Sequence, residues 1–307
     1  MADVYELIAN GPPPDREQFI GPWFQAGDLV MLYAPRGAGK TRVSLKLAHT
    51  LCSGSEFAGY KVPRPIKVAY FDGEMGSEQM SRILVATDEA ARKGFTENTF
   101  FMYTYDRFDG GQIPDISQPA GQALYDKLSK GCEVIVIDNL LSCCQPAGRN
   151  DNDVEQWGRI LQWLLRKRKA GVAVLIIHHA GKSGDQLGTS VRENALDTVV
   201  QLKPSRCAKD SEYGVEWHFT KSRNFFGEDA LPLNVTFQSA DDGIQDWKAE
   251  KLWDAQTRVF WEYEKKYGKQ VAKEYLNLQG WEVAKLEYEG DDLETRIRDY
   301  MEPDDDF

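Results

Sequence analysis

Residues 28–41 read DLVMLYAPRGAGKT, and this stretch sets the expectation for the whole fold. The apolar run 28–34 predicts a buried strand, and the glycine-rich turn behind it leads directly into a helical pattern. This order is what a phosphate-binding loop requires, because backbone N–H groups and a helix N-terminus then face one anion. Lys40 would reach the β and γ phosphate oxygens, and Thr41 would hold Mg²⁺. The first position of the loop is Ala34, where the common form of the pattern has glycine.

The residues expected to surround the nucleotide follow one another in the chain. Gly37 and Gly39 supply backbone room that larger residues would block. A chance match in a glycine-rich turn is the alternative, and the strand before the loop and the helix after it argue against that alternative. The predicted nucleotide-binding residues are Ala34, Pro35, Arg36, Gly37, Ala38, Gly39, Lys40, Thr41 and Arg42.

Strands and helices alternate through the middle of the chain. Further apolar runs lie at 66–72, 99–105, 132–138 and 171–177, and helical patterns lie between them at 76–92, 116–130 and 153–170. Uniformly apolar strands are covered on both faces, and their alternation with helices predicts an α/β fold with a mostly parallel sheet. From residue 196 the segments ALDTVVQLK, GVEWHFTKSR and LPLNVTFQ predict antiparallel strands added to one edge of that sheet.

The 307 residues suffice for one large α/β domain with additions. We expect a proline-rich lead-in at 1–27, a nucleotide-binding core at 28–247, a helical C-terminal region at 248–300 and an acidic tail at 301–307. The helical region rests on the spacing in TRVFWEYEKKYGKQVAKEYL and DLETRIRDYM. The tail EPDDDF is expected to be disordered.

Composition restricts the partners and the compartment. The net charge is −11, but the acidic stretch 287–307 carries −8 of it, so the preceding chain is nearly neutral and can still present a basic channel. The five cysteines form no CxxC pair, and the four histidines show no metal-ligand spacing, which indicates reduced thiols and no zinc site. No membrane span and no signal segment is recognisable, so we expect a cytoplasmic protein without a membrane partner.

Two strand ends carry acidic side chains suited to phosphate chemistry. Asp138 closes VIVID, where a carboxylate is the usual partner of phosphate-bound Mg²⁺. Its alternative role is an ordinary strand-end aspartate that bonds to its own loop. Glu74 follows the strand in YFDGEM, and it is predicted to orient the attacking water. Asp72 is the competitor for that role, and its alternative is to cap the loop.

Two further groups of polar residues follow later strands. His178 and His179 end the fifth strand, where a side chain lies beside the γ-phosphate and can report its presence, although sequence does not rank the two. Lys182 and Arg192 lie in the Gly- and Ser-rich loop that follows, and are candidates for nucleic-acid binding or for mere solvent exposure. Lys221 and Arg223, in FTKSRN, are placed to reach a nucleotide held by a neighbouring subunit, although such a pair on a strand is usually surface charge.

Taken together, these motifs resemble those of the RecA-like ATPases, and within them the hexameric replicative helicases of the DnaB group and the plasmid RepA type. The resemblance covers about residues 20–240. Alanine is common at the first loop position in that group, which accounts for Ala34. The resemblance implies a catalytic Glu74, a metal-supporting Asp138, and a Lys-x-Arg finger at Lys221 and Arg223 that acts across the subunit interface. His178 or His179 would couple the γ-phosphate to a DNA-binding loop.

The resemblance implies ATP and Mg²⁺ as cofactors, a homo-oligomer, expected as a hexamer, and single-stranded DNA as the polymer in plasmid- or phage-like replication. The 27 N-terminal residues cannot supply the primase-engaging domain of the DnaB group. The acidic tail ending in Phe307 is similar to C-terminal peptides that dock on replication proteins, with a solvating tail as the alternative.

Three functions remain open. The first is a helicase, the second is an ATPase switch or loader that remodels a protein partner, and the third is a small-molecule kinase. The few basic residues between 181 and 195 favour the switch. The kinase is disfavoured because no arginine-rich lid is recognisable and because Glu74 suits water activation better.

Overall fold

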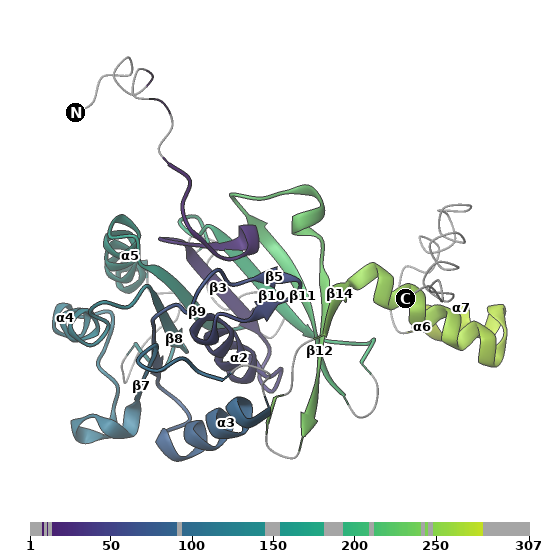
Figure 1. Ribbon diagram of the computed structural model, residues 1–307, viewed down its shortest axis with the longest axis horizontal. Coiled ribbons are helices and arrows are strands. Elements are labelled where there is room, and N and C mark those ends of the chain that lie inside the picture. The colour runs from purple at the N-terminus through teal and green to yellow at the C-terminus, as the bar shows by residue number, and fades with distance from the viewer. Residues whose placement is uncertain are drawn as a thin grey trace. The chain divides into compact units, whose positions relative to one another are not determined.

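The computed structural model describes residues 14–90, 94–144, 154–180, 193–208, 212–240, 243–244 and 248–278, together with Ile8 and Gly11. The chain divides into two compact units, Met1–Glu250 and Lys251–Phe307. The first unit contains the large sheet and its helices (Figure 1). None of the described helices combines the length and the apolarity needed to cross a membrane.

One large sheet organises the first unit. Its strands are β3 Leu29–Ala34, β6 Val68–Asp72, β7 Phe100–Thr104, β8 Val134–Asp138, β9 Ala173–His179, β10 Thr198–Pro204, β11 Glu212–Ser222, β12 Leu233–Ala240, β13 Gly243–Ile244 and β14 Lys248–Lys251. They lie in the order β13-β12-β11-β10-β3-β9-β8-β6-β7, and β14 pairs with β12. The strands from β10 to β7 run parallel, whereas β11, β12 and β13 are antiparallel to their neighbours. The predicted mostly parallel α/β sheet with antiparallel additions is therefore confirmed.

Helices cover both faces of this sheet (Figure 1). One face packs against α2 Lys40–Ser53 and α3 Ser77–Ala90, and the other packs against α4 Pro119–Leu128 and α5 Val154–Lys169. The shorter elements are β1 Gln18–Ile20, η1 Gly21–Trp23, β2 Phe24–Gln25, β4 Glu56–Phe57, β5 Tyr60–Lys61, η2 Tyr105–Arg107, η3 Asp109–Gly111 and η5 Gly227–Ala230.

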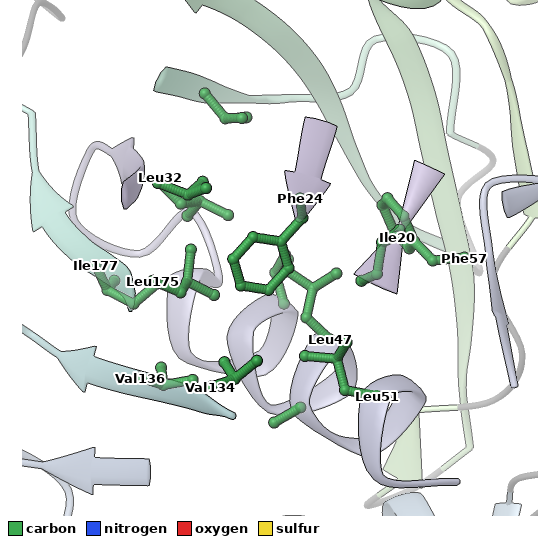
Figure 2. Close-up of a cluster of buried hydrophobic side chains, with 14 of the residues drawn as sticks. Ile20, Phe24, Leu32, Leu47, Leu51, Phe57, Val134, Val136, Leu175 and Ile177 are labelled. Atoms are coloured by element: carbon green, nitrogen blue, oxygen red, sulfur yellow. The ribbon is translucent and has the colours of Figure 1, made fainter. Parts of the chain in front are cut away.

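Two hydrophobic cores, one on each face of the sheet, explain why the strands are apolar without interruption. Figure 2 shows Leu32, Val136 and Ile177 on the side of the sheet that faces Leu47 and Leu51 of α2. The residue before or after each of them along its strand lies in the other core, against α4 and α5. Because side chains alternate along a strand, a strand buried on both faces has apolar residues at every position.

The end of the predicted lead-in is part of the core. Trp23 is only 1% exposed, and its ring stacks on Phe24 and meets Trp217 edge-on at 5.2 Å between centroids. Phe24 itself points into the cluster beside α2 (Figure 2). The described residues after the proline-rich stretch thus pack against β11 instead of lying apart from the domain.

The direction of β10 corrects one expectation. The segment from residue 196 was expected to begin an antiparallel edge, but β10 pairs in parallel with β3, with Thr198 opposite Val30 and Gln201 opposite Tyr33. Only the later strands are antiparallel. An alternation of apolar and polar residues carries no information on strand direction, which depends on the end of the sheet at which the chain re-enters.

The C-terminal region also departs in detail from the prediction. Residues 248–251, expected to begin the helical region, form β14 in the sheet. The helical run that follows is two helices, α6 Leu252–Tyr267 and α7 Lys269–Leu278, interrupted at Gly268, whose φ of 85° is accessible mainly to glycine. The second predicted helix and the acidic tail lie beyond residue 278, outside the described residues.

Candidate active site

The predicted phosphate loop joins the carboxyl end of β3 to the N-terminus of α2. Gly37 and Gly39 both have positive φ, 78° and 75°, which explains the two glycines of the pattern. Lys40 begins α2 and is buried, and its Nζ donates to the carbonyl oxygens of Ala34 at 3.1 Å and Pro35 at 2.9 Å. The loop therefore curls around the lysine, and its N–H groups and the helix N-terminus form the kind of cradle that binds phosphates.

The charge on Lys40 is balanced within the site. Burial lowers the pKa of Lys40, while the carboxylates of Asp138 and Glu74 raise it and Arg36 lowers it. Because little water screens a buried ammonium group, it attracts a polyphosphate strongly, and the nearby carboxylates offset part of this attraction. Arg36 and Arg42 are exposed on either side of this lysine.

Tyr213 of β11 touches the loop from a distant part of the sequence. A Cβ atom added to Gly39 would lie 1.8 Å from the hydroxyl oxygen of Tyr213, so the tyrosine side chain would have to move away. The tyrosine ring is itself packed on Phe237, with 4.7 Å between centroids. Glycine is thus favoured at position 39 both by its backbone angle and by the neighbouring tyrosine.

Asp138 lies at the end of β8, on the face of the sheet that α2 covers. Its carboxylate is 3% exposed and accepts a hydrogen bond of 2.5 Å from the hydroxyl of Tyr70. The hydroxyl of Ser44 lies 3.4 Å from the same oxygen and 2.7 Å from that of Tyr70. Burial raises the pKa of Asp138 to about 6, against the hydrogen bonds from Tyr70 and Thr41, which lower it.

These oxygens suit a magnesium ion. A buried carboxylate next to a threonine hydroxyl at the start of α2 supplies hard oxygen ligands, which Mg²⁺ prefers. A divalent cation would also favour the charged form of Asp138, which burial disfavours. Thr41 and Asp138 therefore fit the metal role that the sequence suggested for them.

Asp72 shapes the loop that follows β6. Its buried carboxylate accepts backbone N–H groups of residues 74–76 at 2.8–3.2 Å. Burial raises the pKa of Asp72, and these backbone hydrogen bonds oppose the rise. With its acceptor sites directed at the loop, Asp72 acts as the cap considered for it from sequence.

Glu74 projects from this capped loop. Its side chain is 58% exposed, and its carboxylate accepts a hydrogen bond of 2.5 Å from the Nδ2 atom of Asn139. The Nε2 atom of His179 lies 3.8 Å from the same carboxylate oxygen. The carboxyl ends of three neighbouring strands, β6, β8 and β9, thus converge on one carboxylate, which is held in place and still reaches solvent.

The two histidines are separated by the alternation of β9. Ile177 lies in the core next to α2, and His179, two residues later, is on the same face as Asp138 and approaches Glu74. His178 is on the opposite face and is 1% exposed. The geometry therefore brings His179, not His178, to the candidate site.

Lys221 and Arg223 lie at the end of the strands opposite the phosphate loop, level with the start of β3. The Nζ atom of Lys221 donates to the carbonyl of Glu193, and the Nη2 atom of Arg223 donates to that of Asn194 at 2.8 Å. The Nη1 atom of Arg223 lies 3.7 Å from Asp197. Strand β11 has a bulge between Phe219 and Lys221, which pair with Val200 and Val199, directly before these two basic residues.

The strand register measures how far this pair is from the loop. Val199 of β10 is opposite both Met31 of β3 and Lys221 of β11, so Lys221 is level with a residue three positions before Ala34. Arg223 lies two residues further away. Arg223 is therefore separated from Ala34 by about 16 Å along the strands and about 10 Å across them. An arginine side chain is too short to bridge this separation, so the pair does not meet the phosphate loop of its own chain.

Sequence reasoning missed four residues of the site. Ser44 lies one helical turn after Lys40, and Tyr70 lies two residues before Asp72 on its strand, so their spacing could have placed them on the site's face. Asn139 follows Asp138 directly. Tyr213 carries no local signal, because only the pairing of distant strands brings it to the loop. The predicted nucleic-acid contacts Lys182 and Arg192 lie outside the described residues.

Comparisons with known proteins identify the family of the chain. A family model described as "AAA domain" (AAA_25) matches residues 2–185, and the chain belongs to this family. It is thus a RecA-like P-loop ATPase. Over 257 residues it is 21% identical to a protein of Methanosphaera stadtmanae named "DNA repair and recombination protein RadB", covering 80% of this chain and 98% of that protein.

Three solved structures are similar to this chain. A KaiC-like protein from Pyrococcus horikoshii matches with a TM-score of 0.50 and 15% identity, covering 76% of this chain and 99% of that one. The flagellar accessory protein FlaH from Methanocaldococcus jannaschii matches with a TM-score of 0.49 and 8% identity, covering 73% and 90%. A RadB recombinase matches with a TM-score of 0.47 and 19% identity, covering 72% and 91%. The fold is RecA-like, whereas none of these relatives is a replicative helicase by name.

Proposed function

We propose that this protein is a ring-forming ATPase motor that acts on single-stranded nucleic acid, as a replicative DNA helicase. In this proposal the loop 34–42 binds the phosphates of ATP, and Thr41 and Asp138 hold Mg²⁺, which neutralises phosphate charge when bound. Glu74 orients the attacking water, with Asn139 and His179 fixing its carboxylate. His179 is the residue we assign to sensing the γ-phosphate.

The separation of Lys221 and Arg223 from their own phosphate loop carries this proposal. Hydrolysis of ATP is accelerated strongly when a positive side chain stabilises the charge on the transferring phosphoryl group. Within one chain the strand register places Arg223 about 16 Å from the start of the phosphate loop along the strands, beyond the reach of its side chain. A head-to-tail neighbour would bring its pair to the loop, and repeated head-to-tail contacts close into a ring when the rotation allows.

Mixing two inactive variants tests the shared site. Lys40→Ala protein lacks the phosphate contact and Arg223→Ala protein lacks the finger, so each alone should hydrolyse ATP poorly. In a 1:1 mixture about a quarter of the interfaces would combine an intact loop with an intact finger, and that share of the activity should return. Lys40→Ala protein mixed with the double variant provides the control, because it contains no intact loop and should stay inactive. A mixture no more active than this control would show that the site is completed within one chain.

Nucleic-acid action needs its own measurement. ATP hydrolysis should rise when a single-stranded DNA oligonucleotide is added, and a forked duplex should be unwound. Replacing Lys182 and Arg192 by alanine should weaken DNA binding and leave basal hydrolysis in place, because neither residue belongs to the nucleotide site proposed here. Stimulation absent with both DNA and RNA would remove the motor proposal while leaving the ATPase.

The likeness to RadB favours a second candidate, an ATPase switch or loader that remodels a protein partner on DNA. That relative is named for DNA repair and recombination, and the match covers 98% of its length. Stimulation by single strands without any unwinding of the forked duplex would select this candidate. Unwinding at a rate that follows ATP hydrolysis would select the helicase.

The remaining assignments are part of the same proposal. We assign the ATPase core to residues 19–251, the helical region to residues from 252 onward and docking of a replication protein to the tail 301–307. A hexamer in the cytoplasm is the assembly we expect. Deletion of the tail should leave ATP hydrolysis intact and reduce binding to a replication partner, and loss of hydrolysis on deletion would contradict the docking role.

A further inference from the structure

The C-terminal turns of α4 and α5 gather positive charge. From Pro119 to Lys130 the chain carries two cations and one acid, and from Gln156 to Ala170 it carries five cations and no acid. The whole chain has 37 basic and 48 acidic side chains, so these two stretches depart strongly from the average. The local charge of a surface, and not the net charge of the chain, decides which partner that surface attracts.

The two helices lie side by side on one face of the sheet (Figure 1). The Nη2 atom of Arg166 donates to the Oε1 atom of Gln122 at 2.8 Å, and Lys167 forms an ion pair with Asp126. Each helix connects parallel strands, so both helices run in the direction opposite to the strands. Their C-terminal turns therefore meet at the same end of the sheet, the end opposite the phosphate loop.

The described acidic side chains near these turns are already engaged by other residues. The pairs are Asp126 with Lys167, Asp197 with Arg168, and Glu133 with Arg64. Asp126 also accepts the Nε1–H of Trp163 at 2.8 Å. Asp115 lies before the N-terminus of α4, about 15 Å from its C-terminal turn, and accepts hydrogen bonds from Ser117.

Four exposed cations are left without an acidic partner among the described residues. The ammonium groups of Lys127, Lys130 and Lys169 form no hydrogen bond or ion pair with any residue that the structure describes. Arg166 is also exposed, and its described side-chain contact is the neutral amide of Gln122. We call these four residues the basic face. Because their charges are not neutralised within the protein, they are available to a polyanion.

The basic face offers charge without a surface on which bases could stack. The aromatic side chains of the two helices, Tyr125, Trp157 and Trp163, are at most 4% exposed. Proteins that hold single strands combine basic residues with exposed aromatic rings. A duplex keeps its bases stacked inside and presents one phosphate charge per about 1.7 Å of its axis. The basic face therefore suits a duplex better than a single strand.

An acidic protein would need apolar anchors as well as charge, because buried apolar and aromatic side chains dominate most protein interfaces. Among their described residues, the two helices expose one large apolar side chain, Leu165 at 42%. The apolar contribution to a protein interface would be small here. The surface thus favours nucleic acid over an acidic protein.

We infer that the basic face is a docking surface for the phosphate backbone of double-stranded nucleic acid. It lies at the end of the sheet opposite the nucleotide site, and it is separate from the segment after β9 to which single-strand binding is assigned above. The inference goes beyond the proposed function and does not depend on ring formation or on unwinding. Binding through phosphates alone carries no sequence preference, so the surface holds any duplex.

The salt dependence of duplex binding tests the inference. Fluorescence anisotropy of a labelled blunt duplex, without nucleotide, should show wild-type affinity falling about 100-fold between about 50 and 200 mM salt, as expected for four neutralised phosphates. Replacing Lys127, Lys130 and Lys169 together by glutamine removes three of the four charges and retains helix propensity. This triple variant should bind at least about 10-fold more weakly at about 50 mM salt and lose only about 3-fold over the same range.

A matched control removes the same charge elsewhere. Replacing the exposed Lys61, Lys203 and Lys248 together by glutamine should leave duplex affinity within about 2-fold of wild type, because none of them belongs to α4 or α5. Equal losses in the control and in the triple variant would show a general effect of net charge and overturn the basic face. A triple variant that binds the duplex as tightly as wild type would also overturn it.

Two competitors test the choice of partner. A single strand of the same length that binds as tightly as the duplex, and is weakened as much in the triple variant, would overturn the assignment to a duplex. Polyglutamate that displaces the duplex at equal charge concentration would overturn the assignment to nucleic acid. The thermal unfolding midpoint and the basal ATP hydrolysis of the triple variant should equal those of wild type, since its three lysines make no described side-chain contact. Duplex binding that persists in a protein without ATPase activity would remove the proposed function and leave the basic face in place.

Discussion

Replacing the buried carboxylate of Asp138 by an amide should make the nucleotide-free protein more stable while impairing its function. Asp138→Asn keeps the size of the side chain and an oxygen that accepts from Tyr70. It removes a charge that the folded protein disfavours, because burial raises the pKa of Asp138 from 3.8 to about 6. A site that holds a costly charge is typical of function.

The size of the expected gain in stability follows from the difference between the pKa of Asp138 in the folded protein and its ordinary value. An acid whose pKa is higher in the folded than in the unfolded state destabilises the fold above both values, by about 3 kcal/mol here. The free energy of unfolding of the wild type should fall as pH rises from about 4 to 6. Above pH 6 the contribution of this carboxyl should stay constant. Asp138→Asn should therefore gain about 3 kcal/mol at pH 8 and about half of that at pH 5.

Urea unfolding without nucleotide or magnesium, followed at both pH values, measures the gain. Low protein concentration is needed at pH 5, because the isoelectric point of the sequence is about 5.0 and the net charge there is close to zero. The same variant should show weaker stabilisation by Mg-ATP, because the proposed metal ligand Asp138 is lost. An Asn variant that is equally or less stable than wild type at pH 8 would show that the charge of Asp138 is well accommodated, and would refute the reasoning.

Three further predictions follow from individual contacts. Gly39→Ala should reduce affinity for a fluorescent ATP analogue more than about 10-fold with the circular dichroism spectrum retained, since its Cβ would lie 1.8 Å from the Tyr213 hydroxyl; unchanged affinity in a titration would contradict this. Asn139→Ala should lower kcat and leave nucleotide affinity unchanged, because it frees the Glu74 carboxylate; an equal loss in both quantities would point to a binding role instead. Trp23→Ala should reduce the free energy of unfolding by about 3–5 kcal/mol in urea, and a loss below about 1 kcal/mol would place the N-terminal segment outside the core.

The phosphate loop could be predicted because its residues are close in sequence. Lys40 and Thr41 follow a strand and a glycine-rich turn, and this local order is enough to place them at a helix N-terminus. Asp138 and Glu74 were found at strand ends, because parallel strands bring their carboxyl ends to one edge. Sequence alone did not decide between His178 and His179. The choice became possible once the structure showed which face of β9 packs against α2.

Other features depended on contacts between distant parts of the chain. The parallel direction of β10 depends on the end of the sheet at which the chain re-enters, and alternation of side chains does not encode it. Tyr213 meets Gly39 only because β11 is placed two strands from β3. The exposure of Phe226 beside the buried Phe225 is likewise invisible in two adjacent phenylalanines.

The sequence by itself therefore determined the class of fold and the local chemistry of the loop, because backbone conformation and strand–helix order are written in neighbouring residues. Only the tertiary structure decided which side chains support Asp138 and Glu74, and at which end of the strands Lys221 and Arg223 lie. The physical reason is that strand order and register set distances between residues far apart in the chain, and those distances decide which charges can meet.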